Sequence, residues 1–223
     1  MATIAVENYL KHTLLLAQRS PDGLVPMGEL ATALQVVPGT ATTMVKALAD
    51  SGLVLHEPRR GLRLTVEGRR VALNVLRKHR LVETFLVNVL KMDWAQVHAE
   101  AEQLEHAISD AVLDRLDALL GHPATDPHGD PIPSVEGTLS SAVYATLASC
   151  ATKASLRVVR VTDQTADFLT FAEAHGLRPG AVAQVLDRNL PAGLVTLRRL
   201  RSKPFALSLA AAGKIWVAPV EAG

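Results

Sequence analysis

Eight histidine and carboxylate side chains in the middle of the chain could bind a metal ion. Four of them lie in the segment 97–106 at spacings of three or four residues: His98, Glu102, Glu105 and His106. At about 100° per residue, these spacings predict that all four fall on one face of a single helix. A face of this kind, beside an apolar stripe, predicts a metal site.

Two further pairs extend this set of donors. His79 and Glu83 are four residues apart in a predicted long helix, so they share one of its faces. Asp126 and His128 lie in GHPATDPHGDPIP, whose prolines and glycines predict an irregular loop. Imidazole nitrogen and carboxylate oxygen suit Mn²⁺ and Fe²⁺ and do not exclude Zn²⁺ or Co²⁺. The single cysteine, Cys150, excludes an internal disulfide and any multi-thiolate zinc or iron–sulfur site.

The first third of the chain predicts a DNA-binding domain. We expect helices over residues 4–18, 27–34 and 39–51, and then the short strands LVLHE and LRLTV, joined by the turn PRRG. A long helix follows, beginning at EGRRVAL. This order of elements is that of a winged helix-turn-helix domain.

In such a domain the helix over 39–51 is the recognition helix, whose first residues face base edges in the major groove. Short hydroxyl side chains suit base edges and phosphates, and a guanidinium at the tip of the wing can reach a phosphate. The alternative is that the threonines cap the helix and the arginines solvate a turn. The candidate DNA contacts are Gly39, Thr40, Thr42, Thr43 and Lys46 on the helix, with Arg59 and Arg60 on the wing.

Charge is unevenly distributed although the formal net charge is only +1. Residues 1–80 hold eleven basic and six acidic side chains, whereas residues 81–140 hold two basic and eleven acidic ones. Residues 141–223 are again basic, with ten against five. A basic first third favours phosphate contact, and an acidic middle favours cations, although either could be a solvated face.

The rest of the chain predicts helices and then a small β module. Apolar residues recur every three or four positions over 94–120, as in one or two helices of a core or a dimer seam. After a linker over 136–153, short alternating segments and one helix near 164–175 predict a β-barrel-like module. No run of about 18 apolar residues and no signal sequence is evident, so we expect a soluble, cytoplasmic protein without a membrane partner.

Three segments resemble the diphtheria toxin repressor (DtxR/MntR) family of metal-dependent transcriptional repressors: RKHRLVE (77–83), VHAEAEQLEH (97–106) and GHPATDPHGDPIP (121–133). The resemblance, which covers essentially the whole chain, implies a mainly α protein with small β parts. It implies a winged helix-turn-helix domain over 1–75, a helical metal-binding and dimerisation domain over 76–140, and an SH3-like or FeoA-like β-barrel over 151–223. It also implies a homodimer that binds a palindromic double-stranded DNA operator.

The resemblance implies an effector metal site made partly by the first helix. Glu102, Glu105 and His106 match the ligands of that site, and the family's helix-one ligand falls on Asn8. Asparagine can coordinate through its carbonyl oxygen but brings no charge. Lys11 stands where one manganese-sensing branch has a second helix-one carboxylate, so the two-metal geometry of that branch is not expected here.

The resemblance implies further sites nearby. His79, Glu83 and His98 match an ancillary site of the iron-sensing branch. His128 together with Glu83 matches a secondary site of other manganese sensors, in which cysteine usually stands at the position of Asp126. The replacement of cysteine by aspartate makes this site harder.

The resemblance also bears on the identity of the metal. The iron-sensing branch has cysteine at the position of Glu102, whereas manganese sensors have glutamate, so we predict Mn²⁺ first and Fe²⁺ second. In the iron-sensing branch the barrel also donates ligands, for which Gln164 and Asp167 are the nearest candidates.

The resulting hypothesis is a Mn²⁺-dependent repressor of metal homeostasis, with an Fe²⁺-dependent regulator of the same family as the alternative. A bound ion is expected to hold two recognition helices about 34 Å apart, one repeat of DNA. Two other classes remain open. In a winged-helix regulator that metal does not control, the His/Glu face would be a polar dimer seam. A metallohydrolase is the third, but no HExxH helix, Ser–His–Asp arrangement or glycine-rich phosphate loop occurs.

Overall fold

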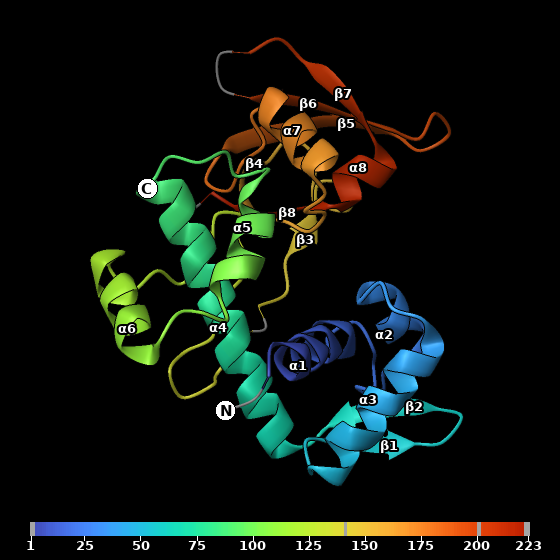
Figure 1. The fold of residues 1–223 in the computed structure, drawn as a ribbon. Coiled ribbons are helices and arrows are strands. Elements are labelled where there is room, and N and C mark those ends of the chain that lie inside the picture. The colour runs from blue at the N-terminus through green and yellow to red at the C-terminus, as the bar shows by residue number, and fades with distance from the viewer. Residues whose placement is uncertain (1–2, 141, 200–201, 221–223) are drawn as a thin grey trace. The chain divides into compact units, whose positions relative to one another are not determined.

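The computed structural model describes residues 3–140, 142–199 and 202–220 of the chain (Figure 1). The chain forms two compact units. Unit 1 comprises Met1–His79, Leu104–Ser109 and Pro133–Leu139, and unit 2 comprises Arg80–Gln103, Asp110–Ile132 and Ser140–Gly223. The division crosses helices α4 (Val66–Asn88) and α5 (Val97–Leu104), so each of these helices contributes residues to both units.

Unit 1 has the predicted order of a winged helix-turn-helix domain. Thr3 caps the first helix by accepting a hydrogen bond from the backbone N–H of Val6, and Pro38 begins the third helix, where a missing N–H costs little. The two wing strands pair antiparallel, with Val54 opposite Leu64. The elements are α1 (Ile4–Ala17), α2 (Met27–Ala33), α3 (Pro38–Asp50), β1 (Val54–Glu57), β2 (Gly61–Leu64) and the first part of α4.

A continuous apolar core holds the helices of unit 1 against the wing. Leu10, Leu30 and Leu48 come from α1, α2 and α3 and are almost completely buried. Val25 exchanges two backbone hydrogen bonds with Leu62, which ties the segment before α2 to strand β2. Strand β2 of the wing is therefore fixed to the segment that leads into α2.

Unit 2 combines the end of α4 and the helices α5 and α6 (Asp110–Leu119) with a six-stranded antiparallel sheet in the order β3-β8-β4-β5-β6-β7. Trp94, just before α5, belongs to the same apolar core as the sheet. The other elements are β3 (Ala145–Thr146), β4 (Ser155–Val161), α7 (Ala166–Ala174), β5 (Val182–Asn189), β6 (Leu194–Arg199), β7 (Phe205–Ser208), α8 (Leu209–Gly213) and β8 (Ile215–Pro219).

The C-terminal module differs from the prediction in three details. Over the described residues the sheet is open and not a closed barrel, because the edge strands β3 and β7 are short and do not pair with each other. The predicted linker 136–153 contains β3. The segment FALSLA is part strand and part helix, because Ser208 ends β7 and accepts a hydrogen bond from the Ala211 N–H to cap α8.

No helix in the described part of the chain has both the length and the apolar character needed to cross a membrane.

Candidate metal centre

The imidazole of His106 lies between three oxygen-bearing side chains of unit 1. Its Nδ1 atom is 2.5 Å from Glu7 Oε2, and its Nε2 atom is 2.9 Å from Asn8 Oδ1 and 3.2 Å from Glu105 Oε1. Metal-binding histidines commonly use one ring nitrogen on the ion and donate the other to a carboxylate. Glu7 is placed to fix the ring in this way, with Nε2 turned toward Asn8 and Glu105.

Glu7 is not among the residues predicted from the sequence, for which the resemblance placed the helix-one contact on Asn8 alone. The two residues are neighbours in the first two turns of α1, and both reach His106. The only signal in the sequence is the carboxylate directly before Asn8. This signal is weak, because an acidic residue in the first turn of a helix is common and is explained by its favourable interaction with the helix dipole. The 99-residue separation between Glu7 and His106 hides the pair.

A buried ion pair occupies the other side of Glu105. The Lys11 ammonium lies 2.6 Å from Glu105 Oε1, and His79 Nδ1 lies 2.5 Å from Glu105 Oε2. The side chains of Lys11 and Glu105 are only 2% and 0% exposed. One positive charge therefore already neutralises this carboxylate within the protein. We refer to Glu7, Asn8, Lys11, His79, Glu105 and His106 together as the helix-one cluster.

The prediction that His98, Glu102, Glu105 and His106 share one helix face is wrong. Helix α5 ends at Leu104, where the Ala107 N–H bonds back to the Leu104 carbonyl in a tight turn. Glu105 and His106 thus lie in this turn rather than on the helix. The sequence still keeps them close to Glu102, because only three or four residues separate them.

Glu102 lies in the last turn of α5, with 28% of its side chain exposed. Its Oε1 atom is 3.6 Å from His98 Nε2. It stands three residues before Glu105, which is bonded to His79, and one ligand atom from each of these three residues lies within 4.8 Å of the others. The predicted association of Glu102 with Glu105 is thus retained, although the helix does not continue between them.

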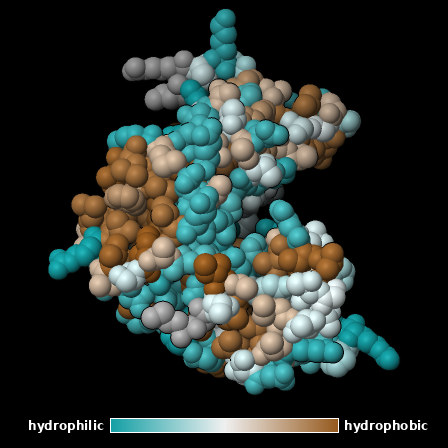
Figure 2. Space-filling model, viewed as in Figure 1, coloured by the Kyte–Doolittle hydropathy of each residue, from teal (hydrophilic) through white to brown (hydrophobic). Residues whose placement is uncertain are grey.

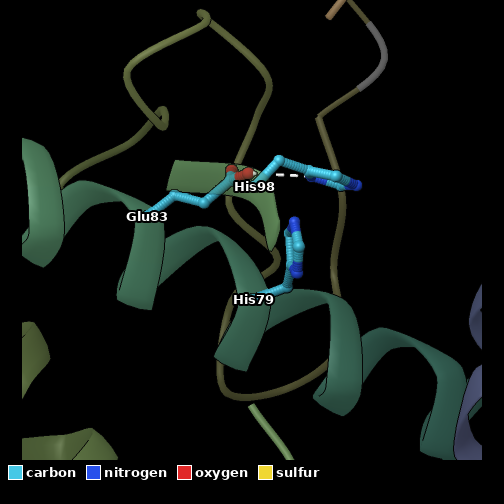
Figure 3. A group of neighbouring side chains, drawn as sticks. All are labelled: His79, Glu83 and His98. Atoms are coloured by element: carbon cyan, nitrogen blue, oxygen red, sulfur yellow. Dashed lines mark hydrogen bonds and ion pairs between the residues drawn. The ribbon is translucent and has the colours of Figure 1, made fainter. Parts of the chain in front are cut away.

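A second group includes two residues of one helix. His79 and Glu83 lie one turn apart on α4, and His98 in the first turn of α5 points toward Glu83 (Figure 3). His98 Nδ1 is 3.1 Å from Glu83 Oε1. A ligand atom from each of the three lies within 4.8 Å of the others, so the predicted ancillary donors are neighbours.

The third group is completely buried and lies within unit 2. It consists of Glu83, Asp126 and His128, which we call the buried trio; they are 1%, 5% and 0% exposed. His128 Nε2 is 2.9 Å from the backbone carbonyl of Trp94, and this oxygen can only accept, so Nε2 carries the proton. In the neutral form of the imidazole, which is the form that binds metal ions, the other ring nitrogen then carries a lone pair.

That lone pair faces two carboxylates at a distance that suits a shared cation. His128 Nδ1 is 3.7 Å from Glu83 Oε2 and 3.8 Å from Asp126 Oδ1, too far for hydrogen bonds. It is buried and has no hydrogen-bond partner among the described residues. Ligand atoms that are each about 2.0–2.2 Å from one ion lie roughly 3–4 Å from one another. The His128 nitrogen lies at such a distance from each carboxylate oxygen, and all three ligand atoms lie within 4.8 Å of one another. The residues present therefore fit a divalent ion.

The electrostatics of the buried trio favour a cation as well. Burial, and then the negative charges of Asp130 and Glu83, raise the pKa of Asp126 well above its usual range. Arg80 opposes this effect, with its Nε atom 3.6 Å from Asp126 Oδ2. A buried carboxylate that is costly to ionise is stabilised by a nearby divalent charge.

The candidate DNA contacts lie on the surface of unit 1. On α3, Gly39, Thr40, Thr43 and Lys46 are exposed and Thr42 is half-buried. The hydroxyls of Thr42 and Thr43 donate to the Pro38 and Gly39 carbonyls, at 2.9 and 3.0 Å, which leaves their oxygens able to accept.

The wing arginines differ in their surroundings. Arg59 has a positive φ of 67° at the tip of the wing and is exposed. Arg60 is also exposed and forms an ion pair of 2.7 Å with Glu57. Arg60 therefore offers DNA less uncompensated charge than its sequence position suggests, because Glu57 already neutralises part of it.

An apolar surface lies over α6 and the residues that follow α4. Val89 and Leu90, which directly follow α4, and Val112 and Leu119 on α6 are between 43% and 65% exposed. Figure 2 shows hydrophobic side chains gathered at the left of the view, where these elements lie. Contiguous exposed apolar surface of this kind marks an interaction site.

Three family models match successive parts of the chain. "Iron dependent repressor, N-terminal DNA binding domain" matches residues 1–62, and "Iron dependent repressor, metal binding and dimerisation domain" matches residues 65–134. "FeoA domain" matches residues 145–219. The order of these matches follows the order of parts that the resemblance implied.

Curated relatives include both iron-dependent repressors and diphtheria toxin repressors. The iron-dependent repressor IdeR of Mycobacterium leprae is 39% identical over 115 residues, which are 51% of this chain and 50% of that protein. The chain thus matches about half the length of this relative. The diphtheria toxin repressor of Corynebacterium diphtheriae is 31% identical over 188 residues, which are 79% of this chain and 81% of that protein.

Solved structures with a similar fold include manganese regulators. One is described as a manganese-dependent transcriptional repressor complex with manganese; it is 37% identical, has a TM-score of 0.85, and is matched over 96% of this chain and 100% of its own. ScaR with bound Cd²⁺ is 32% identical with a TM-score of 0.77, over 96% and 99% of the two chains. Iron- and manganese-dependent proteins therefore both resemble this chain.

Proposed function

This chain belongs to the diphtheria toxin repressor family of metal-dependent transcriptional repressors, and on that basis we propose that it is a Mn²⁺-responsive, homodimeric repressor of metal homeostasis genes. The family is one of DNA-binding regulators and not of enzymes, which removes support from the metallohydrolase alternative. Fe²⁺ is the second candidate for the ion.

The observation that carries this proposal is the lone pair of His128. This buried ring nitrogen faces two carboxylate oxygens at 3.7 and 3.8 Å and has no hydrogen-bond partner in the described part of the chain; a divalent cation would supply a partner. The Nε2 proton on the Trp94 carbonyl fixes the tautomer that ligation requires. Glu83, Asp126 and His128 would hold the ion, and its positive charge would offset the repulsion between the two carboxylates.

The chemistry of the donors favours Mn²⁺ among the divalent ions. Every candidate ligand is a carboxylate, an amide oxygen or an imidazole, and Cys150 lies apart from them in the core of the C-terminal module. Oxygen-rich sites suit Mn²⁺ better than softer ions, although selectivity also depends on geometry and on cellular supply. The manganese-dependent repressor of similar fold supports the same choice.

We propose a single ion held by Asn8, Glu105 and His106 of the helix-one cluster together with Glu102. Glu7 would orient the His106 ring, and the Lys11 ammonium supplies a fixed positive charge where a second cation would otherwise be needed. His79, Glu83 and His98 would form the ancillary site. Because Glu83 belongs to two of the groups, its two oxygens would serve different ligand sets.

The exposed face of α3 and the wing would contact DNA. We assign base contacts to the residues from Gly39 to Lys46 and phosphate contacts to Arg59 and Arg60. The apolar surface over the end of α4 and over α6 would join two copies of the chain, consistent with the match to a dimerisation domain. A two-fold dimer of this kind recognises a palindromic operator.

Metal titration tests the proposal most simply. Full-length protein is stripped with chelator and titrated with Mn²⁺, and anaerobically with Fe²⁺, by calorimetry. We expect Mn²⁺ binding that weakens at least tenfold, or is lost at one site, in His128→Ala, and that is unchanged in His122→Ala. His122 is an exposed histidine, 2.8 Å from Asp117, that belongs to none of the three groups. Equal Mn²⁺ binding by His128→Ala and the unsubstituted chain would contradict the proposal.

A further inference from the structure

The loop that carries two members of the buried trio is held by side chains from the C-terminal sheet. Arg160 on β4 forms an ion pair with Asp130 Oδ1, and the Gln164 amide donates to Asp130 Oδ2. Asp130 is only 4% exposed. Both oxygens of this carboxylate thus contact residues close together in the sequence: Arg160 lies on β4, and Gln164 lies just after this strand.

Asp130 is in turn joined to a candidate ligand through the backbone. The N–H of Asp130 donates to Asp126 Oδ1 at 3.0 Å, and the N–H of His128 donates to the same oxygen at 2.8 Å. The N–H of Asp126 closes the turn on the Asp130 carbonyl at 2.9 Å. The orientation of the Asp126 carboxylate therefore depends on where Asp130 is held.

Strand β4 also supports the loop directly. The Val161 N–H donates to the carbonyl of His128 at 2.8 Å. Gly129, with a positive φ of 87°, lies so close to the Val159 carbonyl that a side chain there would not fit. The loop thus rests on the strand at the residue that follows His128, which limits how far the imidazole can move.

Charge and stacking keep Arg160 in place. Its guanidinium lies over the Trp216 ring on β8, 5.1 Å from the ring centre. Arg80 approaches both Asp126 and Asp130, at 3.6 and 3.7 Å. With Arg160 on Asp130, the charge of Arg80 is shared between the two carboxylates; without Arg160, Asp130 would depend on Arg80 and Gln164 alone.

From these contacts we infer that Arg160 is a positioning residue for the buried trio, acting through Asp130 to hold Asp126 and His128 in the arrangement that binds a divalent ion. The C-terminal sheet thereby sets the affinity of a site whose three candidate ligands, the members of the buried trio, lie outside the sheet. Gln164, which the resemblance suggested as a ligand, supports Asp130 in the same way. This inference rests on the proposed function, because it requires that the trio binds an ion.

The experiment measures Mn²⁺ affinity in the full chain carrying His106→Ala, which removes the helix-one site. Arg160→Met in this background is expected to weaken binding by about 10- to 100-fold, as substitutions behind metal ligands commonly do. Arg160→Lys is expected to recover part of the lost affinity, because lysine restores a positive charge beside the Asp130 carboxylate. Arg157→Met, at an exposed arginine on the same strand, is the matched control and should bind as the background does.

A double-mutant cycle separates positioning from a general loss of structure. If Arg160 acts through Asp130, then Asp130→Asn with Arg160→Met should bind no more weakly than Asp130→Asn alone. Additive losses, or an equal loss in Arg157→Met, would overturn the inference. Should Arg160→Met fail to fold, Gln164→Ala carries the test, with an expected weakening of several-fold and unchanged affinity as the contrary result.

Different outcomes overturn the inference about Arg160 and the proposed function. If the background protein binds Mn²⁺ and Arg160→Met binds it equally well, the inference is overturned and the proposed function is untouched. If neither the background nor the unsubstituted chain binds Mn²⁺, the proposed function is overturned and the inference with it.

Discussion

The ammonium of Lys11 lies 2.6 Å from Glu105 Oε1, and both side chains are almost completely buried. A buried ion pair costs desolvation on both sides, so it adds little net stability, but removing one partner leaves the other charge uncompensated. Glu105 also contacts His79 and His106. The helix-one cluster therefore contains a cation of its own, the Lys11 ammonium, beside Glu105, where a second metal ion would otherwise be needed to neutralise the carboxylate.

The variant Lys11→Met tests whether the Lys11 ammonium takes the place of a metal ion beside Glu105. In chelator the variant is expected to lose about 3–5 kcal/mol of unfolding free energy, because Glu105 is left buried without its cation. Added Mn²⁺ should restore stability and should bind more tightly than in the unsubstituted chain. Urea denaturation with and without Mn²⁺ measures both effects. Lys153→Met, at an exposed lysine, is the control, and unchanged stability of Lys11→Met in chelator would count against this account.

Glu83→Gln should affect two groups of donors at once. Glu83 Oε1 faces His98 at 3.1 Å and Oε2 faces His128 at 3.7 Å, so the variant removes charge from both. We expect fewer Mn²⁺ ions per chain by equilibrium dialysis, whereas His98→Ala should affect only the ancillary group. Glu100→Gln, at an exposed carboxylate on α5, should keep the full number. Full occupancy in Glu83→Gln would refute the shared role.

Arg59→Ala should weaken DNA binding by removing one phosphate contact. The loss is expected to be similar on all sequences, and the slope of log affinity against log salt should fall by about one. Fluorescence anisotropy at several salt concentrations measures this slope. Arg115→Ala, on the exposed face of α6 in the acidic part of the chain, should leave it unchanged. An unchanged slope in Arg59→Ala would exclude it from the interface.

The lowered pKa of Asp22 predicts that the stability of unit 1 depends on pH. The Ser20 hydroxyl, the Leu24 N–H and the Arg63 guanidinium lower the pKa of Asp22 to about 2, from an ordinary value of 3.8. Because the folded state binds this proton more weakly, the carboxylate stabilises the fold above about pH 4, and the contribution is lost as the pH falls toward 2. Asp22→Asn should lower the melting temperature at pH 6 relative to Asp114→Asn and should not lower it at pH 2. An equal decrease at both pH values would contradict this origin.

The local elements of unit 1 could be predicted because each leaves a periodic or turn-forming signal. Pro38 and Gly52 bracket the recognition helix, and the alternation of Val54 to Glu57 marks a strand. The break after Leu104 could not be predicted in the same way, because apolar residues continue at helical spacing through it. The turn after Leu104 depends on tertiary contacts, such as the hydrogen bond that the Lys78 ammonium donates to the Ile108 carbonyl.

The members of the candidate site could be chosen from residue type, but their partners could not. Imidazoles and carboxylates at helical spacing identified His79, Glu83 and His106. Glu7 and Arg160 act across long stretches of chain and look in the sequence like any surface charge. Such pairs depend on tertiary packing, which periodicity does not encode. The open sheet also depends on packing, since the strand pattern alone fits an open or a closed arrangement.

In the proposed dimer a divalent ion and DNA should favour the same state, and one measurement tests this coupling directly. DNA duplexes are selected from a random pool with the full chain and Mn²⁺, and the affinity for the selected duplex is then measured in chelator-treated buffer with and without Mn²⁺. Linkage predicts binding about 5- to 150-fold tighter with Mn²⁺, and a loss of this difference in Glu105→Gln. Equal affinity in the two buffers would contradict the account.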